Sequence, residues 1–232
     1  MTALYDRACG AIRGIYDRRI SGPPILDMDT FFPAGQQFAG AWEAIREEAL
    51  AAAARLHAIP RFHEIMHEQE SISANDNRDW RMLILKAYGI DFPRNAAACP
   101  LLASIVDSLP EVVSASVSFL APRKHIPPHR GPFRGVLRYY LGLVMPRTSE
   151  GELAAVLKIA GQPHRLAEGE SLLWDDTYMH EVWNASDQVR IVLLLDVWRR
   201  DMPPDMELFS HLLASLIRTG IRARRVAQQF DA

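Results

Sequence analysis

Residues 112–121, VVSASVSFLA, alternate apolar side chains with small polar ones, which is typical of a strand with one buried face. Short turns rich in Gly, Pro, Asn and Asp separate the segments that follow. The further segments of strand character are 135–145, 153–160, 169–176, 180–186 and 189–200. Strands at such close intervals favour an all-β barrel or sandwich over a parallel sheet that alternates with helices.

The chain on either side of these strands has helical character. Segment 39–59 is rich in Ala, Leu, Glu and Arg and is followed by Pro60, and segments 98–109 and 206–230 also follow a helical period. We therefore predict a single domain over residues 1–232, mainly β with flanking helices. Its parts are a mostly helical N-terminal part at 1–110, a β core at 111–203 and a C-terminal helix at 204–232.

Composition excludes several classes of protein. A formal net charge of −2 gives no electrostatic case for nucleic acid as a partner. No run of about 18 apolar residues exists, so no transmembrane segment is expected. Residues 1–17 carry charges every few positions, unlike a signal peptide, and Cys9 and Cys99 form no CxxC pair. These features predict a cytoplasmic protein with reduced thiols.

The predicted C-terminal helix leaves two interpretations open. Residues 206–228 contain leucines opposite arginines, which suits a helix lying on a membrane surface. The same pattern suits a helix that packs against the β core with an exposed basic tip, and this second interpretation is preferred.

Two histidines in the β core stand out as metal ligands. His129 lies in HIPPHRGPFRG, residues 125–135, between two predicted strands, and His180 opens the strand HEVWN directly after the turn DDTYM. A mononuclear iron site of the facial-triad type uses two His and one carboxylate, usually as His-x-Asp/Glu with a later His. The position two after His129 is Gly131, which has no side chain. On spacing alone the triad is incomplete.

Arg190 lies in QVRIVLLLDVW, on what should be a central strand. A charged side chain is rarely fully buried without a partner. Arg190 therefore either forms a salt bridge within the chain or clamps the carboxylate of a small co-substrate. The carboxylates available for the salt bridge are Asp175, Asp176 and Asp196.

These residues carry a resemblance to a known family. The motifs HxGP, RxxLGL, DDTxxHEVWN and R-x5-DVW, within residues 76–203, resemble the catalytic domain of the aspartyl/asparaginyl β-hydroxylase family, which includes bacterial lipid A hydroxylases. The resemblance implies a double-stranded β-helix (a jelly-roll or cupin-like core). It also implies a dioxygenase that uses Fe(II), 2-oxoglutarate and O2, with glycine in the acid position of the triad.

The resemblance also assigns roles by position. His129 and His180 match the metal ligands, Gly131 the missing acid, and Arg190 the arginine that binds the distal carboxylate of 2-oxoglutarate. Further matches are Ser118 and Tyr140 for the co-substrate, although animal members have histidine where this chain has Tyr140. Arg138 and Trp80 match positions facing the substrate, and Trp80 is equally well explained as a core residue.

Because the triad lacks its acid, we expect hydrogen bonds to the metal-bound water to be unusually important. Asp175 and Asp176 are the groups expected to make them, and either one is equally well explained as a cap of the turn before His180. His125 and Arg134 receive no role.

The predicted function is hydroxylation of an unactivated carbon in a small molecule or peptide, with the β-carbon of an aspartyl or asparaginyl group preferred. A lipid A-type acyl chain is the alternative. A non-catalytic cupin-like module that binds a carboxylate, or a zinc protein, are competing interpretations that the histidine pair disfavours.

Overall fold

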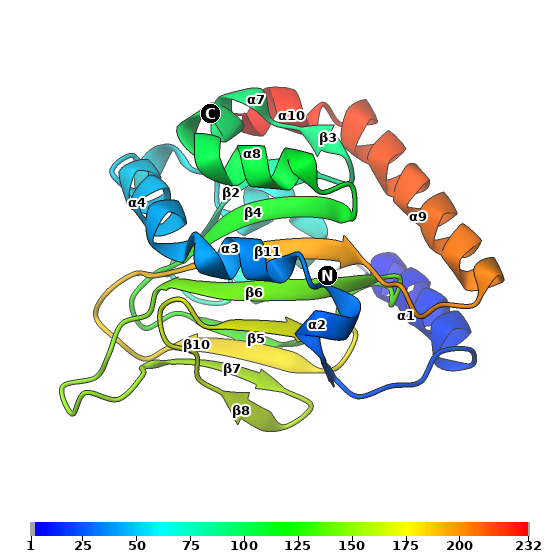
Figure 1. Ribbon diagram of the computed structural model, residues 1–232, viewed down its shortest axis with the longest axis horizontal. Coiled ribbons are helices and arrows are strands. Elements are labelled where there is room, and N and C mark those ends of the chain that lie inside the picture. The colour runs from blue at the N-terminus through cyan, green and yellow to red at the C-terminus, as the bar shows by residue number, and fades with distance from the viewer. Residues whose placement is uncertain (1–2, 232) are drawn as a thin grey trace.

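The computed structural model describes residues 3–231 as two antiparallel sheets packed face to face, with helices over the outer face of the larger sheet (Figure 1). The larger sheet has seven strands in the order β1-β9-β6-β11-β4-β2-β3, and the smaller has four in the order β5-β10-β7-β8. All of their strand pairs are antiparallel. This is the predicted fold, a double-stranded β-helix with flanking helices.

The strands at 112–120 and within 136–198 agree with the predicted segments, whereas those before residue 112 and those at His125–His129 and Gln162–His164 were not predicted. The strands of the larger sheet are β1 (Ile25–Leu26), β2 (Trp80–Ala87), β3 (Ile90–Asp91), β4 (Val112–Leu120), β6 (Val136–Val144), β9 (Ser171–Trp174) and β11 (Arg190–Trp198). Those of the smaller sheet are β5 (His125–His129), β7 (Ala155–Ile159), β8 (Gln162–His164) and β10 (His180–Asn184). β11 is the middle strand of the larger sheet, as expected for the strand that carries Arg190.

Helical segments fill most of the N-terminal part and the C-terminus. The helices are α1 (Ala3–Asp17), α2 (Met28–Phe31), α3 (Gly35–Gly40), α4 (Trp42–Ala53), α5 (Phe62–Ile65), α6 (Glu70–Ser73), α7 (Pro93–Ala98), α8 (Pro100–Ser108), α9 (Pro204–Ala223) and α10 (Val226–Phe230). Two short 3-10 turns span Leu56–Ala58 and His67–Gln69.

Three details of the prediction were wrong. The helix expected over 39–59 is divided at Ala41, after Gly40, a residue of low helix propensity, and it ends at Ala53. The C-terminal helix is divided at Arg225, whose φ of 51° lies in the left-handed region. The segment around His129 is a strand and not a loop. β5 is an edge strand, and its register to β10 shifts at Pro127 and Pro128, so the two prolines interrupt no regular ladder.

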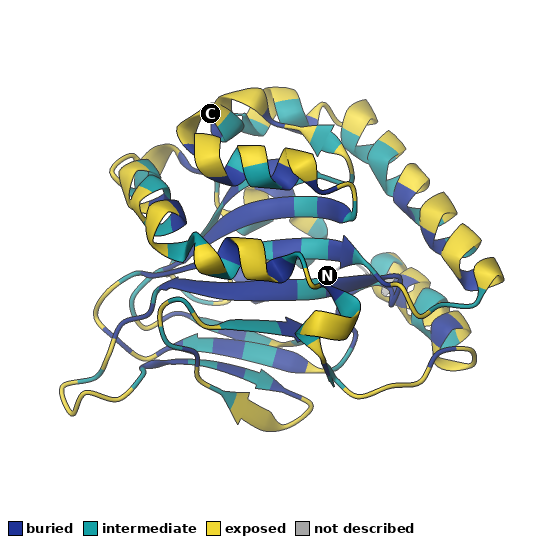
Figure 2. Cartoon of the chain, viewed as in Figure 1, coloured by how far each residue is buried: buried dark blue, intermediate teal, exposed yellow. Residues whose placement is uncertain are grey.

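Side-chain alternation divides the larger sheet into two faces. One face of β11, with Ile191, Leu193 and Leu195, packs against residues of α3, α4 and α8 in the main hydrophobic core. The other face, which includes Arg190 and Val192, looks toward the smaller sheet, since Val192 packs in a cluster with Ile126 and Val182 of β5 and β10. Figure 2 shows the strands largely buried beneath exposed helix surfaces. The space between the two sheets is called the barrel interior below.

Candidate active site

The two histidines lie directly opposite each other on neighbouring strands. His129 ends β5 and His180 begins β10, and the two residues are paired across the strands. Their ring centroids are 4.0 Å apart, with the rings inclined at 58°. Strand pairing therefore brings together two residues that lie some fifty positions apart in the chain.

Each ring is held in one tautomer by its own backbone. His129 Nδ1 donates to the carbonyl of Pro127 at 2.8 Å, and His180 Nδ1 donates to that of Tyr178 at 2.9 Å. Since a carbonyl only accepts, the proton of each neutral ring is on Nδ1 and the lone pair on Nε2 is free. Burial lowers the pKa of His129 to about 4 and that of His180 well below its ordinary value. Both rings are thus neutral, the form that binds metal ions.

Arg190 is buried without an internal partner. Its side chain is 2% exposed, and its Nε and Nη1 atoms make no hydrogen bond to any described residue. The salt bridges considered for it are absent within residues 3–231, because Asp175 pairs with Arg134 and Arg199, and both Asp176 and Asp196 pair with Arg138. Burial lowers the pKa of Arg190, but a guanidinium stays charged in proteins. The site therefore contains a desolvated cation that lacks a counter-ion.

The predicted co-substrate residues surround this cation. The Arg190 guanidinium lies 5.6 Å from the centre of the Tyr140 ring. Ser118 is opposite Val192 in the register of β4 and β11, so it lies on the same face as Arg190. Trp80 Nε1 donates to Ser118 Oγ at 3.0 Å. That bond uses the serine as an acceptor and leaves its hydroxyl proton available to another group.

Arg138, predicted to face an acidic substrate, is already engaged. Its Nη2 atom is 2.9 Å from Asp196 Oδ1 and 3.2 Å from Asp176 Oδ2. It shares the inward face, since Arg138 and Asp196 are opposite each other on β6 and β11. Its guanidinium thus joins two carboxylates of the chain itself.

The position left empty by Gly131 is filled by another residue. A Cβ atom at residue 131 would lie 2.0 Å from Asp176 Oδ1, and Gly131 N–H donates to the Asp176 carbonyl at 2.7 Å. Asp176 Oδ1 is buried and makes no hydrogen bond to a described residue. Burial raises the pKa of Asp176 to about 7, with Asp196 and Asp175 acting in the same direction and Arg138 opposing them. A buried, unpaired carboxylate oxygen therefore lies beside the histidine pair.

The neighbouring Asp175 caps the turn instead. Its Oδ1 accepts from the backbone N–H of Thr177 at 3.0 Å, and its Oδ2 is 2.9 Å from both Arg134 and Arg199. Arg134, which received no role from the sequence, therefore holds this turn through Asp175. His125, also unassigned, stacks on Trp183 with centroids 4.6 Å apart and lies 3.2 Å from Glu181, away from the histidine pair.

Trp174 was missed by sequence analysis. It ends β9, is 2% exposed, and its indole edge meets the His180 ring with centroids 4.6 Å apart. Its Nε1 atom is buried without a hydrogen-bond partner among the described residues. The only signal in the sequence was an aromatic residue at the end of a strand, directly before the DD turn. The barrel interior thus contains unpaired polar atoms of three side chains, from Arg190, Asp176 and Trp174.

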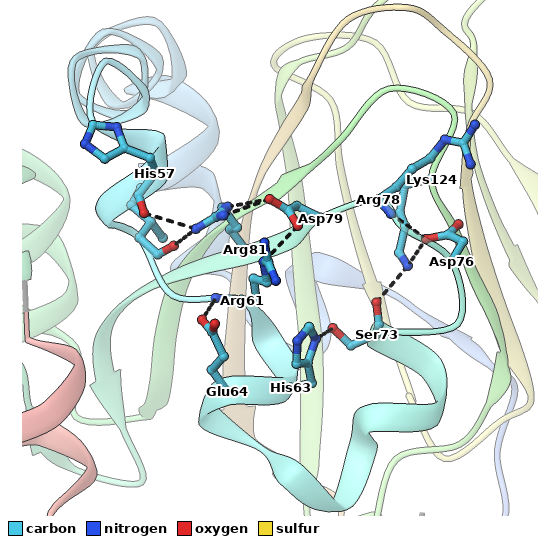
Figure 3. Close-up of polar contacts among 11 residues, drawn as sticks. His57, Arg61, His63, Glu64, Ser73, Asp76, Arg78, Asp79, Arg81 and Lys124 are labelled. Carbon is cyan, nitrogen blue, oxygen red and sulfur yellow. Dashed lines mark hydrogen bonds and ion pairs between the residues drawn. The ribbon is translucent and has the colours of Figure 1, made fainter.

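Two ion-pair networks hold the segment that leads into Trp80 (Figure 3). On one side, Asp79 is 2.9 Å from Arg61 and 2.8 Å from Arg81. On the other, the fully buried Lys124 amine donates to the carbonyl of Ser73 at 2.7 Å and to Asp76 at 2.6 Å. A cleft of about 460 Å³ beside Arg61 and Arg81 has both arginines paired with Asp79, so it does not compete with Arg190 as an anion site.

The histidines suit a metal ion held by two protein ligands. Within the described part of the chain, no group of three or more His, Cys, Asp and Glu side chains is arranged to bind a metal. The fit instead rests on two free Nε2 lone pairs, a nearby unpaired carboxylate oxygen and a buried cation that needs an anion. A metal ion with an anionic chelator would satisfy the two histidines and Arg190, and a water on that metal would be a donor for the Asp176 oxygen.

Comparisons with known proteins bear on the family of this chain. A family model described as aspartyl/asparaginyl beta-hydroxylase matches residues 39–200. The chain is 35% identical to the ornithine lipid ester-linked acyl 2-hydroxylase of Rhizobium tropici over 77% of its own length and 61% of that protein. It is 29% identical to human aspartyl/asparaginyl beta-hydroxylase, over 70% of its own length and 21% of the human chain.

The alignments thus span about three fifths of the bacterial relative and one fifth of the human one. Among solved structures, a predicted oxalate decarboxylase from Thermotoga maritima is similar with a TM-score of 0.34 and 13% identity, covering 52% of this chain and 81% of that one. The family model covers both histidines, Arg190 and the strands that carry them, and the chain belongs to the aspartyl/asparaginyl beta-hydroxylase family.

Proposed function

We propose that this protein is an Fe(II)- and 2-oxoglutarate-dependent dioxygenase that hydroxylates an unactivated carbon. The observation that carries the proposal is the bare Arg190 guanidinium, buried in the interior that also contains the neutral His129 and His180 rings. A buried cation without a counter-ion is costly unless a ligand supplies the anion. The distal carboxylate of 2-oxoglutarate is an anion of suitable size, and its oxo-acid end is a metal chelator.

In this proposal each residue has a defined task. His129 and His180 would hold Fe(II) through Nε2, and the metal with 2-oxoglutarate and O2 would supply the oxidising chemistry. Arg190 binds the distal carboxylate through its guanidinium, whose Nε and Nη1 atoms are unpaired. Ser118 donates its hydroxyl proton to the same carboxylate, because Trp80 already occupies its acceptor side.

Asp176 compensates for the missing third protein ligand. Its unpaired Oδ1 accepts a hydrogen bond from a water molecule beside the histidines, while Arg138 holds its other oxygen. Residue 131 must then be glycine so that this carboxylate has room. The acid reaches the site from the turn before β10 instead of from the His129 strand.

For the substrate, the contacts of Arg138 favour an acyl chain. Asp196 and Asp176 already balance the charge of Arg138, so an acidic substrate side chain there would meet two carboxylates of the chain itself. The interior is otherwise apolar, with Leu120, Val192 and Trp174 in one cluster. The Rhizobium tropici relative is by name an acyl 2-hydroxylase of a lipid. The β-carbon of an aspartyl or asparaginyl group, as in the name of the human relative, is the second substrate class.

Iron-dependent release of succinate from 2-oxoglutarate tests this function. The purified chain would be assayed with Fe(II), ascorbate and two panels, acyl lipids and Asp- or Asn-containing peptides. Wild type should release succinate, and His180→Ala should not. His125→Ala is the matched control, since this histidine lies outside the pair and should leave turnover intact.

Two results would contradict the proposal. Binding of 2-oxoglutarate without succinate release across both panels would favour the non-catalytic carboxylate-binding module. Turnover that survives His180→Ala would show that the histidine pair is not the metal site.

A further inference from the structure

One apolar face of helix α9 packs against the rest of the protein. Met206, Ser210 and Ala214 are buried, and Phe209, Leu213 and Ile217 pack partly buried against the cluster that contains Tyr16 and Phe133. Ser210 Oγ is 2.6 Å from Tyr16 Oη and donates to the Met206 carbonyl at 2.7 Å. This face by itself anchors the helix, as the preferred sequence interpretation expected.

A second apolar stripe on α9 is largely exposed. Leu208, Leu212 and Leu216 are 62%, 57% and 69% exposed. Their spacing of four residues aligns them along one side of the helix, and we call them the leucine ridge. The sequence alone grouped these leucines with Leu213 and Ile217, whereas the structure separates the two sets. Figure 1 shows α9 at the edge of the molecule, and Figure 2 shows its outward side exposed.

The charges around the leucine ridge have one sign. From Leu208 to Phe230 the sequence contains no acidic residue, and its arginines are Arg218, Arg222, Arg224 and Arg225. The two acids of the first turn lie before the ridge, and one of them, Asp205, is paired with Arg19. Arg222 and Arg225 are exposed. Arg224 is paired with Glu68 at 2.7 Å. An apolar ridge followed by the exposed Arg222 and Arg225 is complementary to an anionic surface with an apolar layer beneath it.

We propose that the leucine ridge and the arginines after it dock the protein on an anionic lipid bilayer. The three leucines enter the boundary between headgroups and acyl chains, and Arg222 and Arg225 contact anionic headgroups. The helix lies on the surface and does not cross it; among residues 3–231, no helix is long and apolar enough to span a membrane. This proposal does not depend on the proposed catalytic function.

A second copy of the chain is a poorer occupant of this surface. A stable protein interface takes about 800 Å² from each partner, and three partly exposed leucines on one helix offer a few hundred at most. The ridge is also a convex row on a single helix, and a lipid surface needs no matching groove.

Docking through α9 would bring the segment after His129 close to the bilayer. The loop after His129 packs beneath α9, since a Cβ at Gly135 would lie 2.4 Å from Ser210 Oγ, and Phe133 and Met206 share one cluster. Arg13 of the neighbouring helix α1 donates to the Gly131 carbonyl at 3.0 Å. Helices α1 and α9 therefore pack against the segment that follows His129.

Vesicle sedimentation with the full chain tests the proposal. Vesicles of phosphatidylcholine with 30 mol% phosphatidylglycerol, roughly the anionic content at which basic helices bind, would be compared with pure phosphatidylcholine. Wild type should pellet with the anionic vesicles, and less so at high salt. The triple variant Leu208→Gln/Leu212→Gln/Leu216→Gln should bind at least ~5-fold more weakly, as should Arg222→Glu/Arg225→Glu.

Matched controls separate docking from loss of fold. Leu50→Gln/Leu101→Gln changes exposed leucines elsewhere, and Arg55→Glu/Arg94→Glu reverses exposed charges elsewhere; both should bind like wild type. Thermal unfolding should be similar for all variants, because the altered side chains are exposed. Wild type that fails to pellet with anionic vesicles would overturn the proposal. A wild-type dimer that the triple leucine variant converts to monomer would also overturn it, because the ridge would then cover a second copy.

Discussion

The Asp176 carboxylate occupies the space that a side chain at residue 131 would need. A Cβ on Gly131 would lie 2.0 Å from Oδ1 and 2.3 Å from the carboxyl carbon, far inside van der Waals contact. The two residues are also joined by the hydrogen bond from Gly131 N–H to the Asp176 carbonyl. The glycine and the aspartate therefore form one unit, in which the acid comes from a different strand end than the first histidine.

Gly131→Ala should accordingly destabilise the protein by about 1–3 kcal/mol through overpacking. It should also abolish metal-dependent turnover, because Asp176 must move. Adding Asp176→Gly should restore stability in part, but not activity, and a double-mutant cycle from thermal unfolding measures that coupling. Gly40→Ala is the control, since a Cβ there meets nothing within 4 Å and should leave stability unchanged or slightly raised. Additive stability effects of the two changes would contradict the contact.

Arg190 and Arg199 are buried alike but should respond oppositely to replacement. Arg199→Met leaves Asp175 with one partner fewer and should cost about 3–5 kcal/mol, as for a broken buried ion pair. Arg190→Met removes a cation without a protein partner and should leave the melting temperature unchanged or higher. The apparent KM for 2-oxoglutarate should rise at least ~30-fold, the loss expected for one side of a buried charge pair. A destabilised Arg190→Met with unchanged KM would make Arg190 structural.

β4 was predictable from its alternation, whereas β2 and β5 were missed. β4 alternates apolar and polar residues because one of its faces lines the interior, and its prediction is confirmed. β2 was missed because Trp80 and Met82 pack on one side while Leu83 and Leu85 pack on the other, so its sequence does not alternate. β5 was missed because its prolines argue against a strand unless its edge position is known.

The candidate site could also be predicted only in part from the sequence. His129, His180 and Arg190 could be predicted from the sequence. The histidines lie next to predicted strands with other polar residues, and the arginine lies within an otherwise apolar strand. The filling of the Gly131 position by Asp176, and the bare indole of Trp174, depend on which strand ends meet. Asp175 and Asp176 are adjacent and identical in type, and only their contacts show that the first caps the turn.

Trp174→Phe tests the unpaired indole N–H. Phenylalanine keeps an aromatic ring against His180 and removes a buried donor that no described residue satisfies, so stability should change little. If the N–H donates to a bound co-substrate or substrate, its loss should raise an apparent KM by roughly 2- to 12-fold, the value of one hydrogen bond. Separate KM measurements for both ligands identify the partner. Trp183→Phe, which alters the tryptophan stacked on His125, should change neither KM.

Lys124 should make the segment before Trp80 sensitive to acid. Its fully buried amine donates to Ser73, Asn75 and Asp76, and Lys124→Met removes all three bonds, at a cost of about 2–4 kcal/mol. Burial alone would raise the pKa of Asp76, but the hydrogen bonds from Lys124 and the backbone outweigh it, and the pKa is lowered.

A carboxyl whose pKa is lowered by folding stabilises the fold at pH values above its pKa in the unfolded chain, about 4. This stabilisation is lost as the pH falls through its pKa in the folded protein. The stability difference between wild type and Lys124→Met should therefore be constant near neutral pH and shrink below about pH 4. Denaturant unfolding at several pH values measures it. Arg123→Met, which breaks the exposed pair with Asp187, should show no comparable loss at neutral pH. A Lys124→Met difference that persists unchanged into acid would mean that the amine acts only through its neutral acceptors and not through the Asp76 charge.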